Sequence, residues 1–96
     1  METTILEPTV EKQLSAEIKE MVNPTKAILL YNDDVNSFEH VIECLILYCN
    51  HSIEQAEQVA LIVHNRGKCD IKHGSYEKLK PVYEALQEKH LSVKIE

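Results

Sequence analysis

Two apolar stripes with helical spacing follow one another almost without a gap, and they restrict the folds open to this chain. The first stripe consists of Phe38, Val41, Ile42, Leu45 and Tyr48, and the second of Ile53, Ala56, Val59, Ala60 and Val63. Ser37 precedes the first as a helix cap, while Ser52 and Gln55 form a capping-box pair before the second. We therefore predict two adjacent amphipathic helices, the second of which ends at Gly67.

Three short segments have the pattern of β-strands. Residues 26–31 are mostly apolar, and residues 68–72 and 91–95 alternate polar and apolar side chains. The order is strand, helix, helix, strand, helix, strand. The simplest structure that buries every stripe is a small α+β domain of β-α-α-β-α-β order, in which helices cover one face of a three-stranded, mainly antiparallel sheet.

A third helix is predicted between the last two strands. Its apolar residues are Leu79, Val82, Tyr83 and Leu86. Ser75 stands where a cap would, but Pro81 interrupts the pattern, because proline has no N–H and its ring crowds the carbonyl of Glu77. We expect either a kinked helix or one that begins near Lys80.

The first 24 residues differ in composition from the rest. They contain five glutamates and two lysines, with Pro24 at their end. Val10, Leu14, Ile18 and Met21 lie at helical spacing, which is enough for a marginal amphipathic helix that forms when a partner binds. We predict a flexible N-terminal extension over residues 1–24 and a core domain over residues 25–96.

Charge and hydropathy argue against several functional classes. A net charge of −6 disfavours nucleic-acid binding, which needs a concentrated basic face. No run approaches the roughly 18 apolar residues of a membrane span, and Glu2 and Glu7 stand where a signal peptide would be basic. We expect a cytoplasmic protein without a membrane partner. Its three cysteines form no C-x-x-C pair and are expected to be buried thiols.

The triplet Asn32-Asp33-Asp34 ends the first predicted strand, and His64 lies near the end of the second helix. An amide, carboxylates and a neutral imidazole all offer hydrogen-bond acceptors, and such a set suits an ammonium group. The triplet alone is more often a turn, and the histidine alone is often structural or placed to complement a helix C-terminus. Their occurrence together favours a binding site.

Catalytic readings have less support. A metal-dependent hydrolase with Asp33, Asp34 and His64 as ligands is one alternative, but neither an H-x-x-x-H nor an H-E-x-x-H pair occurs. A G-x-S-x-G elbow is absent, and the two glycines, Gly67 and Gly74, are too few for a phosphate-binding loop. We therefore expect a non-enzymatic protein without a metal or cofactor.

Several short pieces in this order resemble the ClpS family of protease adaptors. They are Leu29-Leu30-Tyr31-Asn32-Asp33-Asp34, Phe38-Glu39-His40-Val41-Ile42, Ala56-Glu57-Gln58-Val59-Ala60 and Val63-His64-Asn65-Arg66-Gly67-Lys68. The resemblance covers about residues 26–96. It implies an adaptor that binds substrates with a bulky hydrophobic N-terminal residue, called N-degrons, and delivers them to a Clp-type AAA+ unfoldase, ClpA or ClpC. A monomer is the default expectation for such an adaptor.

The resemblance also implies roles for particular residues. Asn32, Asp33 and His64 match the positions that hold the substrate α-amino group. The matching hydrophobic pocket consists of Asn36, Phe38, Val41, Ala60, Val63 and Leu91. Glu77 matches an acidic position that contacts the unfoldase, whereas Val82 stands where many relatives have lysine.

The main departure from the family is in the pocket, where Phe38 and Ala60 replace methionines found in many relatives. Amine capture is therefore better supported than the choice among Leu, Phe, Tyr and Trp. Besides the hydrolase, a protein-interaction domain of the same fold without amine recognition is the other alternative.

Overall fold

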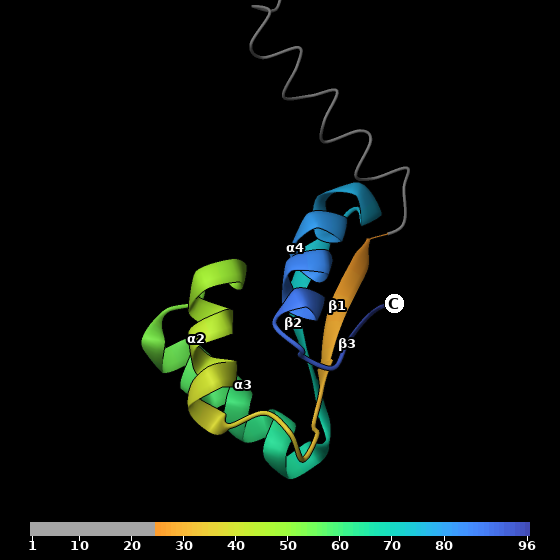
Figure 1. Ribbon diagram of the computed structural model, residues 1–96. Helices are drawn as coiled ribbons and strands as arrows, with labels where there is room; N and C mark the ends of the chain where they lie inside the picture. The colour runs from red at the N-terminus through yellow and green to blue at the C-terminus, as the bar shows by residue number, and fades with distance from the viewer. Residues whose placement is uncertain (1–24) are drawn as a thin grey trace, which may run out of the picture.

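The computed structural model describes residues 25–96 and contains three strands and three helices in that range (Figure 1). These are β1 (Lys26–Tyr31), α2 (Phe38–Cys49), α3 (Ile53–Arg66), β2 (Lys68–Gly74), α4 (Tyr76–Glu88) and β3 (Val93–Ile95). The predicted element order and α+β class are confirmed. The proposed extension and its possible helix lie outside the described residues.

The sheet has the strand order β2-β1-β3, and β1 is antiparallel to both neighbours. Leu30 lies opposite Cys69 on β2 and Val93 on β3. The register with β2 shifts between Ile28 and Leu29, so the pairing is irregular there. Because β1 is central, the loop that follows its last residue begins between the two outer strands, β2 and β3.

The core lies between the sheet and the helices. Figure 1 shows α4 lying along the sheet, with α2 and α3 packed together beside it. The largest fully buried side chains are Ile28, Leu30, Leu45, Leu79 and Leu86. Each contributes about 1.5–3 kcal/mol by burial, and together they connect the central strand to α2 and α4.

Serine caps all three described helices. The hydroxyls of Ser37, Ser52 and Ser75 accept hydrogen bonds from backbone N–H groups three residues later, at 3.1, 3.1 and 3.3 Å. Asn50 ends α2 with φ 57°, and Gly67 ends α3 with φ 92°, the left-handed conformation that glycine adopts without strain. The predicted starts of α2 and α3 and the glycine stop are therefore confirmed.

Of the two alternatives for the third helix, a start near Lys80 is wrong. α4 begins at Tyr76 after the Ser75 cap and continues through Pro81. Leu79, in the first turns, is completely buried. This burial and the cap outweigh the one backbone hydrogen bond that proline cannot donate to the Glu77 carbonyl.

The last strand is shorter than predicted. Leu91 still donates its N–H to the Leu86 carbonyl over 3.1 Å, and His90 has φ 67°, so this part of the chain is a helix ending rather than a strand. Pairing with β1 begins where Tyr31 N donates to Ser92 O over 2.8 Å. The alternation of apolar residues correctly predicted a strand here, but the predicted start at Leu91 was wrong.

The three cysteines are free: Cys44 and Cys49 are buried, and Cys69 is half-buried. Burial raises the pKa of the Cys49 thiol to about 11, which keeps it unreactive near neutral pH. Within residues 25–96 the helices fall short of the length and hydropathy that a membrane span requires.

Replacing Pro81 by alanine is expected to stabilise the domain by about 1–2 kcal/mol. Alanine restores a helical N–H and removes the ring clash, and this gain exceeds the smaller benefit that proline brings by restricting the unfolded chain. Urea unfolding of wild type, Pro81→Ala and the exposed-site control Glu84→Ala measures it. A Pro81→Ala variant no more stable than wild type would contradict the account of α4.

Candidate functional site

A cleft of about 310 Å³ opens between the β1–α2 loop, the start of α2 and the end of α3. Its lining residues are Asn32, Asp33, Asn36, Phe38, Val41, Ala60, Val63 and His64. The volume lies at the lower end of the range of about 300–1,000 Å³ usual for small-ligand pockets. The cleft is therefore large enough for one side chain with its backbone ends.

The ends of β1 and α3 are fixed to each other at the polar side of this cleft. Asn32 N donates to the Gly67 carbonyl over 2.8 Å, and Gly67 N donates to the Val63 carbonyl over 2.9 Å. His64 lies in the last turn of α3 and is exposed. Asn32 and His64 thus face one cleft from two elements. The C-terminal end of a helix also carries partial negative charge, which favours a cation.

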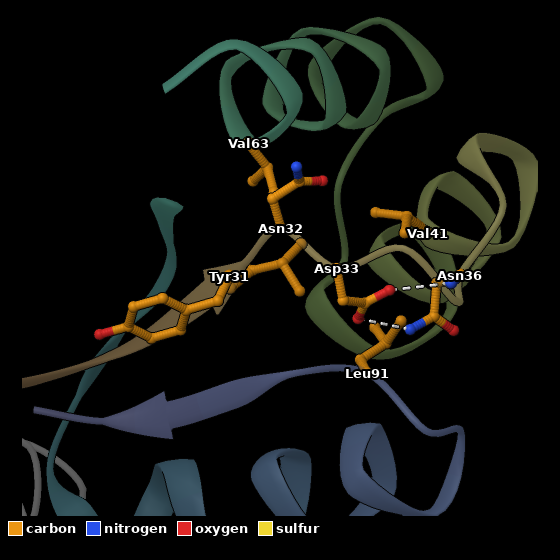
Figure 2. A pocket seen from close by; sticks show the side chains of 8 residues that line it. Tyr31, Asn32, Asp33, Asn36, Val41, Val63 and Leu91 are labelled. Atoms are coloured by element: carbon orange, nitrogen blue, oxygen red, sulfur yellow. Dashed lines mark hydrogen bonds between the residues drawn. The ribbon is translucent and has the colours of Figure 1, made fainter. Parts of the chain in front are cut away.

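The side chains of Asn32 and His64 have no hydrogen-bond partner among residues 25–96. Asn32 is exposed at the end of β1, and Figure 2 shows its amide beside Val63. An amide oxygen and a neutral imidazole nitrogen are both acceptors. Within the described part of the chain, both groups are therefore available to a ligand.

Asp33, in contrast, accepts four hydrogen bonds within the domain. Oδ1 accepts from the backbone N–H groups of Val35 and Asn36 at 3.0 and 2.8 Å. Oδ2 accepts from Asn36 Nδ2 and from Ser92 Oγ, both at 2.8 Å. The two bonds to Asn36 are drawn in Figure 2. A carboxylate has about four acceptor positions, so all of them are occupied.

These contacts also control the charge of Asp33. Partial burial pushes the pKa up, but hydrogen bonds from Asn36, Ser92 and Val35 stabilise the charged form more strongly. The pKa of Asp33 is consequently below its ordinary value of 3.8. The stabilisation is present above that ordinary value and is lost as pH falls through the folded-state pKa. At neutral pH the cleft therefore contains a fixed negative charge.

The cleft adjoins a smaller cavity of about 30 Å³. Leu30, Tyr31 and Leu91 line this cavity together with five residues that also line the larger cleft. Figure 2 shows Leu91 approaching from the connection before β3, below Asp33. Leu91 is 5% exposed, so it forms a hydrophobic floor rather than a rim.

The mouth of the cleft has exposed apolar side chains. Phe38 is 39% exposed and lines the cleft, and Val35, in the loop before it, is 86% exposed. Ala60, on the opposite wall, is buried and small. An aromatic group at the entrance and a methyl group on the wall leave the interior open.

The structure brings together most of the residues singled out in the sequence. The three residues assigned to amine binding and five of the six assigned to the pocket line one cleft, and Leu91 lines the adjoining cavity. Asp34 is exposed and lines neither. Glu77 lies in the first turn of α4, also outside the cleft.

Two residues next to the site were missed. Ser92 donates to Asp33, and the His90 carbonyl accepts from Asn36 Nδ2 over 2.9 Å. They lie 59 and 54 residues from these partners in the sequence. Neither stands in a motif, so nothing local in the sequence could have identified them.

The hydrolase alternative receives no support from the described part of the chain. Residues 25–96 contain no group of three or more His, Cys, Asp or Glu side chains placed to hold a metal ion. Asp33 is also fully engaged by donors, so it has no free position for a ligand bond to a metal.

Residues 22–94 match the family model of the ATP-dependent Clp protease adaptor protein ClpS. The ClpS adapter protein of Desulforapulum autotrophicum is 33% identical over 64 residues, covering 65% of this chain and 62% of that protein. That of Edwardsiella ictaluri is 38% identical over 63 residues, covering 66% and 58%. The chain thus matches about three fifths of the length of these relatives.

The fold is also similar to a solved structure. The structure of Agrobacterium tumefaciens ClpS2 bound to L-phenylalaninamide matches with a TM-score of 0.64 at 20% identity, covering 75% of this chain and 94% of that chain. This likeness supports the fold, and the family match extends over most of the sequence. The chain belongs to the ClpS family of ATP-dependent Clp protease adaptor proteins.

Proposed function

We propose that this protein is a non-enzymatic adaptor that binds the free N-terminus of proteins beginning with a bulky hydrophobic residue and delivers them to a Clp-type AAA+ unfoldase. The observation that carries the proposal is one cleft with acceptors at one end that have no partner among residues 25–96, and with apolar walls at the other end. A free N-terminus beside a hydrophobic side chain has the complementary chemistry.

The polar end suits an α-ammonium group for electrostatic reasons. Such a group has three N–H donors and a charge that is costly to remove from water without acceptors. In this proposal Asn32 and His64 accept hydrogen bonds from it directly. Asp33, whose acceptor positions are already occupied, contributes its negative charge from a fixed position.

The apolar end accommodates the first side chain of the substrate. Val41, Ala60 and Val63 form the wall in this proposal, Leu91 the floor and Phe38 the entrance, with Asn36 at the polar edge. Burying a Leu or Phe side chain contributes about 1.5–3 kcal/mol. Hydrogen bonds to the charged amine add roughly a similar amount each. After the cost of association, we expect an affinity on the order of micromolar.

The ligand of the Agrobacterium relative supports this assignment. L-Phenylalaninamide has a free α-amine, an aromatic side chain and an amide in place of the carboxylate, and a polypeptide that begins with Phe has the same features at its first residue. In this proposal a group of the same chemistry occupies the present cleft.

Delivery requires a second surface. We assign this role to the exposed first turn of α4, where Glu77 lies on a different element from the cleft. Residues 1–24 are proposed to act as an N-terminal extension that engages the unfoldase, ClpA or ClpC, and residues 25–96 as the core. The adaptor is proposed to work as a monomer in the cytoplasm, where ATP supports the unfoldase.

Peptide binding tests the proposed function. A fluorescent peptide that begins with Leu is expected to bind with a Kd on the order of micromolar in an anisotropy titration. Its N-acetylated twin lacks the cation, and a peptide beginning with Glu lacks the apolar side chain, so neither should bind appreciably. Equal binding of all three, or none, would favour an interaction domain of the same fold without amine recognition.

Replacing His64 by alanine is expected to weaken binding of the Leu peptide by about tenfold, because one acceptor for a charged donor is lost. His73→Ala is the matched control, since His73 lies on β2 and pairs with Asp70 at 2.8 Å outside the cleft. Titrations of both folded variants measure the difference. Unchanged affinity in His64→Ala would remove this residue from the binding site.

A further inference from the structure

The connection between α4 and β3, residues 89–92, lies outside the larger cleft yet contacts the segment that builds it. Four hydrogen bonds join the two: His40 Nε2 to Lys89 O at 2.8 Å, Asn36 Nδ2 to His90 O at 2.9 Å, Ser92 Oγ to Asp33 Oδ2 at 2.8 Å, and Tyr31 N to Ser92 O at 2.8 Å. Residues 31–40, which include the loop and the start of α2, are thus hydrogen-bonded to residues 89–92. We call residues 89–92 the support.

Ser92 has a special position in this support. It lines neither the larger cleft nor the smaller cavity, so a ligand in them has no direct contact with it. Its backbone carbonyl holds the last residue of β1, and its hydroxyl holds the first carboxylate of the loop. Ser92 therefore holds the loop at two points, next to its beginning at Tyr31 and at the Asp33 carboxylate.

The Ser92 hydroxyl and the Asn36 amide share one oxygen of Asp33, and two backbone N–H groups share the other. The contacts to Val35 and Asn36 come from within the loop, so they would move together with it. Among the donors that residues 25–96 supply to this carboxylate, Ser92 is the one that comes from outside the loop. Its bond therefore holds the charged group directly to the rest of the domain, beside the indirect link that Asn36 Nδ2 makes to the His90 carbonyl.

We propose that Ser92 is a positioning residue for recognition of the substrate N-terminus: its hydroxyl holds the Asp33 carboxylate in place relative to the acceptors of Asn32 and His64, which have no partner among residues 25–96. This inference rests on the proposed function. Without the hydroxyl, the carboxylate loses its direct bond to the segment before β3 and keeps the indirect link through Asn36 Nδ2 and the His90 carbonyl. The loop then has more freedom, and ordering it costs part of the binding free energy.

Three variants separate this role from a loss of stability. Ser92→Ala removes the hydroxyl, and Ser92→Thr retains one at the same position. Ser75→Ala is the matched control, because it removes a serine hydroxyl that caps α4 without touching Asp33. Two quantities are measured for each variant. The first is the Kd for the Leu peptide, and the second is the pKa of Asp33, determined by NMR titration of its carboxyl carbon.

Ser92→Ala is expected to bind the Leu peptide about three- to tenfold more weakly than wild type, the loss that one hydrogen bond to a charged group can produce. Its Asp33 pKa should rise, because the charged form loses a donor. Ser92→Thr should bind the Leu peptide with a Kd within about twofold of the wild-type value, and its Asp33 pKa should be close to that of wild type. Ser75→Ala should leave both unchanged.

Native affinity in Ser92→Ala would overturn the inference, whatever its effect on the pKa, as would an unchanged pKa of Asp33. A loss of affinity in Ser75→Ala equal to that in Ser92→Ala would also overturn it, because stability alone would then explain the effect. Failure of the wild-type protein to bind the Leu peptide is a separate result. It would reject the proposed function itself, and the positioning role with it.

Discussion

The Asp33 carboxylate is the interaction on which the site depends. It accepts two backbone donors from its own loop, one amide from Asn36 and one hydroxyl from Ser92. These bonds shape the turn between the central strand and α2, and they attach it to the chain before β3. The packing of the sheet and helices thus fixes the orientation of the Asp33, Asn36 and Ser92 side chains.

In the proposed function, this arrangement divides the work of binding between charge and hydrogen bonding. Asp33 supplies a negative charge, but the acceptor positions of its carboxylate are filled. Asn32 and His64 have acceptors without a partner within residues 25–96. A carboxylate held by neutral donors does not have to reorganise when a cation arrives. Because preorganisation reduces the ordering cost, a small cleft can reach useful affinity with few contacts.

The sequence predicted the parts of the fold that depend on local patterns. Apolar periodicity located the strands and helices, and Ser37, Ser52 and Gly67 marked helix ends, because capping involves residues only a few positions apart. The start of α4 was missed, since burial of Leu79 outweighs the preference of Pro81. The start of β3 was missed for a similar reason: the helix ending extends to Leu91.

The residues that line the cleft were singled out in the sequence, but the contacts that support them were not. A family pattern identifies side chains that line the cleft, whereas the partners of Asp33 and Asn36 near residue 90 depend on how distant segments meet in space. For the same reason the sequence presented Asp33 as an open acceptor. Only the geometry reveals that its acceptor positions are already in use.

The most direct test of this account is a crystal structure of the protein with a peptide that begins with Leu. The account predicts that the α-amine lies within about 3 Å of Asn32 Oδ1 and of a His64 ring nitrogen, with the Leu side chain between Val41 and Val63. Asp33 should keep its bonds to Asn36 and Ser92. A peptide bound outside the cleft, or an amine that displaces Ser92 from Asp33, would contradict it.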